Sequence, residues 1–379
     1  MYWQTEVLRS GMPWTKGTSL VLELPNYGLL SALLLHGYGT PVNDSMIATQ
    51  KWRMIDFVSK IEVIGNGSTP IKSFPATLGH FLSWMDGAGG APDKHFNYAT
   101  STKRWHGIVP FGRGLFDPYF GLDMSKWRGV ELRVTNDASG TYFTGDLTLD
   151  VIAVWLRDGK PDQFAGYFKT EVWREYTTVQ DGKEYIDLPE EHMLRRIVYQ
   201  VIPSVDSDNK ANTTPYNVAY NIDFTIRTGT AKLFDGSLRD LWYLNYFDHG
   251  RDVIQPLEPY HTGGKGIWTG LGQTLVAAGA RLPHDATQDT ASTSLEPGND
   301  SSTLARYTDV DSDQDSLLVM GLALENCAYI RFNQGAEPDD YLDLVRNASV
   351  RTVITTRNDA SAAGGTIRVA IDRLLPHPS

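Results

Sequence analysis

Two segments of this chain match each other, although 164 positions separate them. One is VLELPNYGLLSALLL at residues 21–35, and the other is YIDLPEEHMLRRIVY at residues 185–199. In each segment a strand-like run ends in Leu-Pro, and a second hydrophobic run follows. The aligned residues include Glu23 and Asp187, Leu24 and Leu188, Pro25 and Pro189, Leu33 and Ile197, and Leu34 and Val198. Such a repeat predicts a chain that contains one folding unit twice.

Two further matches follow in the same order along the chain. Each copy continues with a predicted strand, a turn and a helix, at 61–87 and at 222–250. Shifting the sequence by 160 positions aligns Phe74 with Phe234 and Leu78 with Leu238. Each copy also has an Asn-Asp-Ala-Ser turn before an alternating strand, at 136–139 and at 358–361. One such turn is common wherever a chain reverses. Three matches in one order predict an internal duplication.

Strand signals dominate both copies. The chain contains 18 Tyr, 10 Trp and 14 Phe, which favour strands, and 35 Gly and 19 Pro, which supply turns. Polar and apolar residues alternate with a period of two, as in a strand with one buried face, in segments such as 129–137 and 146–156. Apolar residues at i, i+3 and i+4 indicate one helix in each half, within 75–87 and 234–250. We therefore predict an all-β protein with a short helix in each half.

The boundary between the halves is predicted near residues 157–166. This stretch, RDGKPDQFAG, is polar and contains Gly and Pro. We expect a first domain at 1–160 and a second domain at 166–379. The repeat offset rises from 160 at the helix to 222 at the Asn-Asp-Ala-Ser turn, so the second half has about sixty additional residues. We expect an insertion at about 251–345, in which the polar, acidic segment 281–316 forms a long loop.

The charge and the cysteine content exclude several functions. The formal net charge is −11 and the amino-terminal segment has no cluster of Arg and Lys, so direct nucleic-acid binding is not expected. Cys327 is the only cysteine, which excludes an intramolecular disulfide and a thiolate metal cluster. The longest apolar stretch, 29–35, is too short to span a bilayer. We expect a soluble protein that is synthesised in the cytoplasm of a cell.

No sequence pattern assigns a catalytic, cofactor-binding or metal-binding residue. Gly-x-Ser-x-Gly, His-x-His and His-Glu-x-x-His motifs are absent, as is a Gly-rich phosphate loop. One acidic run has an aspartate at every second residue, which is the spacing found in a calcium-binding loop. It lacks the glycine that such a loop has at its sixth position, and Met320 replaces the acidic residue at the twelfth. Its members are Asp309, Asp311, Asp313 and Asp315. A solvated loop is favoured, and calcium binding there is left open. No enzymatic activity and no cofactor are expected.

Carbohydrate binding or hydrolysis is the alternative interpretation. Paired carboxylates and aromatic rings are the usual means of holding and cleaving sugars. The candidate acids are Glu23, Asp187, Glu62 and Asp223, and the candidate rings are Trp105, Trp127, Trp155 and Trp173. The acids match between the halves, which indicates outward-facing strand positions, and the rings are more typical of a core or an interface. The basic pairs Lys103-Arg104 and Arg195-Arg196 are interpreted as a solvated or salt-bridged surface.

Two sandwich halves, each with a helix after its early strands and a closing hairpin, resemble the double jelly-roll major capsid proteins. These are coat proteins of tailless icosahedral viruses in the adenovirus and tectivirus lineage. The resemblance covers about residues 19–375 and depends most on KIEVIGNGSTPIKSF, at 60–74, and its counterpart NIDFTIRTGTAKLFDGSLRDLWYLN, at 221–245. It implies two eight-stranded jelly-roll sandwiches in tandem. The family has no invariant functional residue, so no residue role is transferred.

The resemblance also implies a function and its partners. Family members form pseudo-hexagonal trimers that tile an icosahedral shell, with long loops rising as towers, and 281–316 is the candidate tower. The chain is then a capsid protein in the virion of a bacteriophage or archaeal virus. Its partners are two further copies, neighbouring capsomers, penton or vertex proteins and minor capsid proteins, with an internal membrane left open. Loop 113–129 is expected to bury apolar area between subunits. A third interpretation, a spike or minor vertex protein, differs in copy number per particle.

Overall fold

The computed structural model describes most of both halves. The described ranges are 1–42, 53–87, 102–140, 142–160, 163–204, 213–227, 229–249, 321–332, 340–347 and 349–378. Backbone alone is described for short strands at 95–97, 253–259, 266–268, 274–281, 296–297, 304–306 and 315–320. Most of the predicted tower, 281–316, and the acidic run from Asp309 to Asp313 lie outside the described residues.

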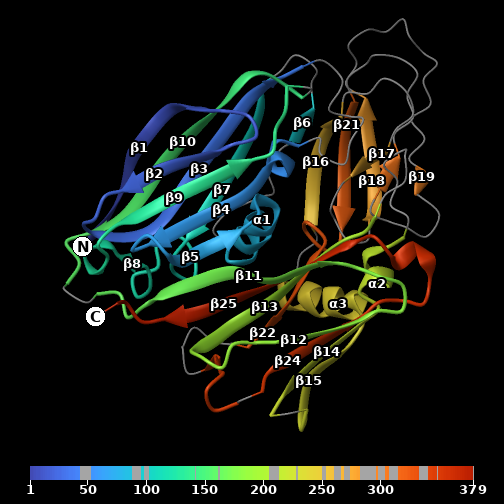
Figure 1. The fold of residues 1–379 in the computed structure, drawn as a ribbon. Helices are drawn as coiled ribbons and strands as arrows, with labels where there is room; N and C mark the ends of the chain where they lie inside the picture. The colour runs from blue at the N-terminus through green and yellow to red at the C-terminus, as the bar shows by residue number, and fades with distance from the viewer. Residues whose placement is uncertain are drawn as a thin grey trace, which may run out of the picture.

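The first half is a sandwich of two layers of strands (Figure 1). Its strands are β1 (Tyr2–Trp14), β2 (Ser19–Leu24), β3 (Leu29–Pro41), β4 (Val58–Gly65), β5 (Thr69–Phe74), β7 (Lys103–Pro110), β9 (Val130–Asn136) and β10 (Phe143–Arg157). One sheet has the order β1-β10-β3-β7, and the other begins β2-β9-β4-β5. Helix α1 (Ala76–Met85) lies between β5 and β7, and β8 (Leu122–Asp123) pairs with β3. Counted along this half, the orders are 1-8-3-6 and 2-7-4-5, which is the jelly-roll arrangement.

The second half repeats the arrangement. Its strands are β11 (Tyr167–Thr177), β12 (Lys183–Asp187), β13 (Met193–Ile202), β14 (Asn221–Ile226), β15 (Ala231–Gly236), β22 (Cys327–Arg331), β24 (Arg351–Thr355) and β25 (Thr366–Leu375). The sheet orders are β11-β25-β13-β22 and β12-β24-β14-β15, again 1-8-3-6 and 2-7-4-5. Its helices are α2 (Pro215–Val218) and α3 (Leu238–His249), and β23 (Leu342–Asp343) pairs with β13. The predicted tandem of jelly-roll sandwiches is confirmed.

The duplication extends to the register of strand pairing. In the first half Leu34 pairs with Ile152, and at the matching place in the second half Val198 pairs with Ala370. Strand β1 has a bulge between Val7 and Arg9, and β11 has one at the same place. Because a bulge inserts one residue and shifts all later pairing, matching bulges show that the two copies correspond residue by residue along these strands.

The strand register corrects one part of the predicted alignment. The sequence match aligned Phe74 with Phe234 at an offset of 160. In the structure Phe74 pairs with Ile61, and its counterpart Gly236 pairs with Ile222, which gives an offset of 162. Helices α1 and α3 begin 162 residues apart as well. The shared Phe is therefore a coincidence of composition, because β5 places Lys72 where β15 has Phe234.

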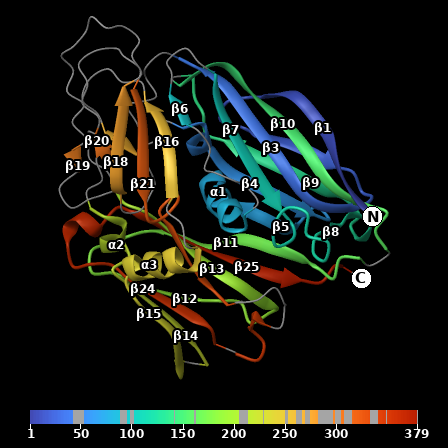
Figure 2. The ribbon, with the colours of Figure 1, turned by 180° about the vertical axis from the view of Figure 1, so that it is seen from behind.

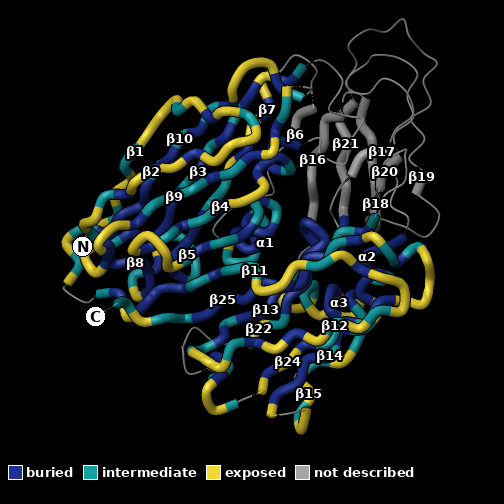
Figure 3. The backbone as a smooth tube through the Cα atoms, in the orientation of Figure 1, coloured by how far each residue is buried: buried dark blue, intermediate teal, exposed yellow. Residues whose placement is uncertain are grey.

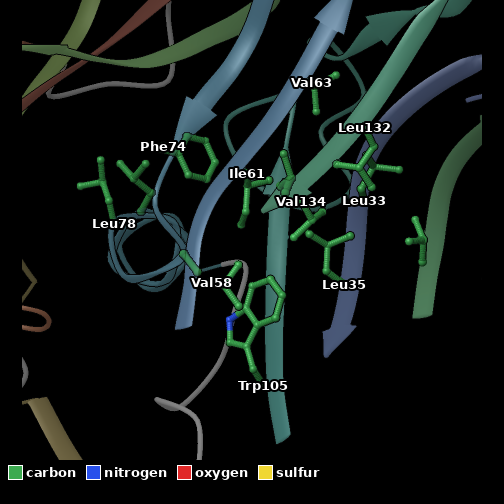
Figure 4. Close-up of a cluster of buried hydrophobic side chains, with 14 of the residues drawn as sticks. Leu33, Leu35, Val58, Ile61, Val63, Phe74, Leu78, Trp105, Leu132 and Val134 are labelled. Atoms are coloured by element: carbon green, nitrogen blue, oxygen red, sulfur yellow. The ribbon is translucent and has the colours of Figure 1, made fainter. Parts of the chain in front are cut away.

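Alternating side chains fill the interior of each sandwich. Strand β2 alternates exposed and buried residues along its whole length, as its sequence predicts. Figure 4 shows Leu33 and Leu35 from one sheet facing Leu132 and Val134 from the other, with Trp105 beside them. The second sandwich has its own cluster, which includes Leu194, Ile197, Tyr199, Ile222, Phe224, Ile354, Val369 and Ile371.

The amino-terminal strand differs from the expectation. The resemblance began near Ser19, but β1 starts at Tyr2 and runs for 13 residues as the edge of the first sheet. Two register shifts interrupt its pairing with β10, one before Arg9 and one between Arg9 and Met12. These shifts break the period-two pattern that would have indicated a strand.

The predicted insertion contains strands of its own. They are β16 (Val253–Pro259), β17 (Gly266–Trp268), β18 (Thr274–Arg281), β19 (Glu296–Pro297), β20 (Leu304–Arg306) and β21 (Asp315–Gly321). Strand β16 pairs with β6 (His95–Asn97) from the first half. Figures 1 and 2 show β16, β18 and β21 at the end of the molecule far from the two termini. Strand β22 also lies in the predicted range 251–345, but its pairing with β13 makes it part of the second sandwich.

Candidate functional site

The two sandwiches are joined through a shared sheet. Strand β5, the last strand of the first sandwich's second sheet, pairs in parallel with β11, the first strand of the second sandwich. Lys72 lies opposite Thr170, and Ser73 lies opposite Glu171. The sheet therefore continues from one half into the other, and its backbone hydrogen bonds fix their relative position.

The first half covers the outer face of the second half's first sheet. A row of four residues crosses that face from strand to strand: Val172, Ala370, Val198 and Tyr329. They pack against the hydrophobic core of the first sandwich rather than that of their own. The Phe81 ring of α1 lies 6.3 Å from the ring of Tyr329. Figure 3 shows most residues of β13 and β25 as buried.

A buried ionic cluster lies beside this apolar row. Asp86, at the end of α1, accepts hydrogen bonds from Arg195 at 2.8 Å and from Arg196 at 2.7 Å. Asp372 Oδ2 lies 3.0 Å from Arg196 Nε and 3.3 Å from Arg195 Nη1. Lys72 donates to Thr170 at 2.8 Å, and Thr170 donates to Asp372. The cluster ties α1 and β5 of the first half to three strands of the second.

Burial sets the protonation of this cluster. Burial alone would raise the pKa of Asp372, but the guanidinium groups of Arg196 and Arg195 outweigh it and hold that pKa below its ordinary value. Lys72 behaves differently: loss of water lowers its pKa from 10.5 to about 8, and the nearby carboxylate of Asp372 reverses only part of this. The ammonium of Lys72 is therefore the cluster's least favourable charge.

We expect Lys72→Met to stabilise the protein at neutral pH. The variant removes a desolvated ammonium while Arg195 and Arg196 still neutralise two aspartates. The lowered pKa corresponds to about 3 kcal/mol, and the lost hydrogen bond to Thr170 offsets about 1 kcal/mol of this gain. Unfolded Lys72 keeps its proton up to about pH 10.5, whereas the folded group releases it near pH 8. Unfolding therefore takes up a proton in this interval, so the native protein gains stability relative to the variant as the pH rises from 8 to 10.5. Urea denaturation of both proteins at pH 7 and pH 10 measures the difference, and an equal difference at both pH values would contradict the assignment.

A second buried cluster joins the halves near the insertion. Arg53 donates from both terminal nitrogens to the two carboxylate oxygens of Glu325, each at 2.8 Å. Asp56 Oδ1 accepts from Arg53 at 2.6 Å, and His80 Nδ1 lies 3.1 Å from Glu325. Burial would raise the pKa of Glu325, but Arg53 and His80 lower it below its ordinary value. Glu325 belongs to the second half and the other three residues belong to the first.

The structure places the sequence-predicted basic pairs in unexpected surroundings. Arg195 and Arg196 form salt bridges, as interpreted, but the side chain of Arg196 is only 5% exposed rather than solvated. Lys103 is buried as well, and burial lowers its pKa to about 7. No sequence pattern singles out Asp86 or Glu325. Two adjacent arginines inside a β-strand were the one available signal.

The residues proposed for sugar binding do not converge. Trp105, Trp127 and Trp155 are buried in the first sandwich, and Trp173 donates its indole N–H to the carbonyl of Asp187. Glu23 and Asp187 line two separate hollows, which lie at matching places in the two halves beside the Leu-Pro segments. The hollow at Glu23 has no aromatic ring in its lining. This repeated arrangement is that of equivalent surface positions and does not support the carbohydrate alternative.

Metal ligands, membrane-spanning helices and the cysteine were the remaining features to locate in the described part of the chain. Within it, no group of three or more His, Cys, Asp or Glu could hold a metal ion. In the same part of the chain no helix is long and apolar enough to cross a bilayer. Cys327 is buried, and burial raises the pKa of its thiol well above the ordinary value, which disfavours the reactive thiolate. Loop 113–129 also differs from the expectation in part, because its residues Phe120, Leu122, Met124 and Trp127 are buried within the chain.

Comparison with solved structures identifies the fold. The major capsid protein of Sulfolobus turreted icosahedral virus superposes with a TM-score of 0.59 at 12% identity, over 100% of this chain and 98% of that one. The PBCV-1 virus capsid gives a TM-score of 0.55 at 10% identity, over 98% and 93% of the two chains. The fold is a double jelly roll. The major capsid protein P2 of bacteriophage PM2 is also similar, with a TM-score of 0.50 at 12% identity, over 99% and 98%.

The likeness to these capsid proteins lies in the structure and not in overall sequence similarity. No protein-family model matches the sequence, and no curated protein matches it. At 10–13% identity the likeness to the capsid proteins establishes the fold. Its coverage of nearly the whole of both chains means that both sandwiches belong to the shared fold.

Proposed function

We propose that the chain is the major capsid protein of a tailless icosahedral virus, with a structural and non-enzymatic role. One observation carries the proposal: two jelly rolls with matching register are joined side by side by a shared sheet and two buried ionic clusters. A rigid pair of equivalent units is suited to contact neighbours on several sides. The three full-length structural neighbours described above are, by name, capsid proteins or capsids.

The proposed assembly unit is a homotrimer. Three copies of a duplicated sandwich supply six similar units, which is the shape that a hexagonal lattice of capsomers requires. The proposed partners are neighbouring capsomers, penton or vertex proteins and minor capsid proteins, and the proposed location is the virion. We keep 1–160 and 166–379 as the proposed domains. The insertion, at the end far from the termini, is the proposed projecting part of the capsomer (Figure 2).

Sedimentation of the purified protein tests this function. At micromolar concentration we expect a single compact species with the mass of three chains, about 127 kDa from a chain of 42.2 kDa. Electron micrographs of the concentrated protein, or of particles that contain it, are expected to show a lattice of such trimers. A strictly monomeric protein over the whole concentration range would contradict the proposal. A trimer present in only tens of copies per particle would instead indicate a vertex protein.

A further inference from the structure

We propose that the buried ionic cluster at the joint between the two sandwiches binds a single chloride ion. The cluster encloses a small cavity of about 10 Å³. The charged side chains that line this cavity are Lys72, Asp86, Arg195, Arg196 and Asp372. The first two belong to the first half and the other three to the second, so an ion held there contacts both sandwiches. The site lies within one chain and is independent of the proposed capsid function.

The charges around the cavity do not balance. Three cations face only two carboxylates, so one positive charge is in excess. The adjacent residues Arg113 and Asp117 do not change this, because they form an ion pair with each other at 2.7 Å. A buried charge without a counter-ion is costly, since the low dielectric of the interior strengthens its repulsion of the other cations. An anion in the cavity removes this cost.

Two of the cations also have hydrogen-bond donors to spare. Lys72 is 2% exposed, and its ammonium donates one of its three N–H groups to Thr170 at 2.8 Å. Among the described residues it has no second acceptor and no ion pair. Arg196 Nε is buried without a hydrogen bond, because Asp372 Oδ2 lies 3.0 Å away but off the direction of the N–H. Buried donors of this kind indicate a bound ligand that accepts hydrogen bonds.

The cavity and its charge together select the ligand. A volume of about 10 Å³ is enough for one particle of about the size of water, which excludes sulfate, phosphate and carboxylate ions. A water molecule can accept the spare hydrogen bonds, but it leaves the excess charge in place. Chloride accepts the same hydrogen bonds and neutralises the charge. Phe74, Leu82 and Ile108 form the apolar part of the wall, which strengthens the attraction between the ion and the cations.

Urea denaturation at fixed ionic strength tests this site, with sodium gluconate replaced stepwise by sodium chloride. A ligand that binds only the folded protein lowers the equilibrium constant for unfolding in proportion to its concentration above the dissociation constant. At pH 7 we therefore expect each tenfold rise in chloride in that range to lower this constant about tenfold. At pH 10 we expect the effect to be much smaller, because the pKa of Lys72 is lowered to about 8 and the neutral amine leaves the cluster without excess charge.

Two lysine variants locate the effect. Lys72→Met removes the excess charge, so its stability is expected to be the same in chloride and in gluconate. Its advantage over the native protein is therefore greatest in gluconate and decreases as chloride is added. Lys60→Met is the matched control, because Lys60 is 49% exposed and pairs with Glu62 on the surface. This variant is expected to keep the full dependence on chloride.

Bromide gives a direct view of the site, because it replaces chloride and scatters X-rays anomalously. In crystals of the native protein grown in sodium bromide, we expect a peak in contact with Lys72 Nζ and Arg196 Nε. Unfolding curves that are the same in chloride and gluconate, or bromide found only elsewhere, would overturn the inference and leave an ordered water in the cavity. A chloride effect that survives in Lys72→Met would overturn it as well. None of these results changes the oligomer, so the proposed capsid function is tested separately by sedimentation.

Discussion

Asp86→Ala is expected to lower the free energy of unfolding by about 3–5 kcal/mol, the range found when one partner of a buried ion pair is removed. Asp86 accepts from both Arg195 and Arg196, and its side chain is 4% exposed. Removing it leaves two guanidinium groups in a site that excludes water, with only Asp372 to neutralise them. The variant therefore weakens the contact between α1 and β13, which holds the two sandwiches together.

Two control variants show whether the lost stability comes from the charge of Asp86, from the volume of its side chain, or from breaking any ion pair. Asp86→Asn keeps the shape but removes the charge, so it is expected to lose a similar amount of stability. Glu184→Ala breaks the exposed ion pair with Arg174 and is expected to cost about 1 kcal/mol or less. Chemical denaturation of all four proteins measures the series. If Asp86→Ala were as mild as Glu184→Ala, the buried cluster would not hold the halves together.

Leu34→Asp is expected to weaken the trimer strongly while leaving the chain folded. Leu34 belongs to an aliphatic row that crosses the outer face of the first sheet and is partly exposed. The row consists of Val7, Ile152, Leu34 and Ile108, and an isolated chain can hydrate a carboxylate there in part. In the proposed trimer the same carboxylate would be buried without a partner, at a cost of several kcal/mol per contact. Since each 1.4 kcal/mol is tenfold in affinity, we expect trimer formation to weaken by about 100-fold or more.

Val21→Asp is the matched control for this prediction. Val21 is also an aliphatic residue on an exposed strand face, at 51% exposure, but it lies on β2 in the opposite sheet of the first sandwich. This variant is expected to remain trimeric. Sedimentation measures the oligomer, and circular dichroism verifies the fold. A trimer that tolerates Leu34→Asp as well as Val21→Asp would show that the row is not an intersubunit surface.

The repeated elements were predictable because their signals are local. The Leu-Pro ends of β2 and β12 occupy equivalent places, and each Asn-Asp-Ala-Ser segment lies at the connection between the seventh and eighth strands of its jelly roll. Alternation along β9 and β10 gave their buried faces directly. Turn chemistry and period-two burial are properties of a few neighbouring residues, so one sequence is enough to find them.

The remaining features depend on contacts between distant parts of the chain. Asp86 and Arg196 are 110 residues apart, and no local pattern shows that one will neutralise the other. The sequence also could not show which outer sheet face is covered, since Val198 and Leu34 are equivalent aliphatic residues and only the first is buried by the other half. Strand β1 is not predictable from alternation because its bulges hide the period of two. The predicted offset of 160 between β5 and β15 was wrong because Phe74 and Phe234 do not occupy equivalent positions.

The central claim is that one chain provides two equivalent sides of a six-sided building block. Electron cryo-microscopy of the purified oligomer tests it most directly. We expect a ring of six similar sandwiches from three chains, with the Val7–Leu34 row buried at every junction between chains. A ring in which that row faces solvent, or an oligomer with no approximate sixfold arrangement of sandwiches, would contradict the account.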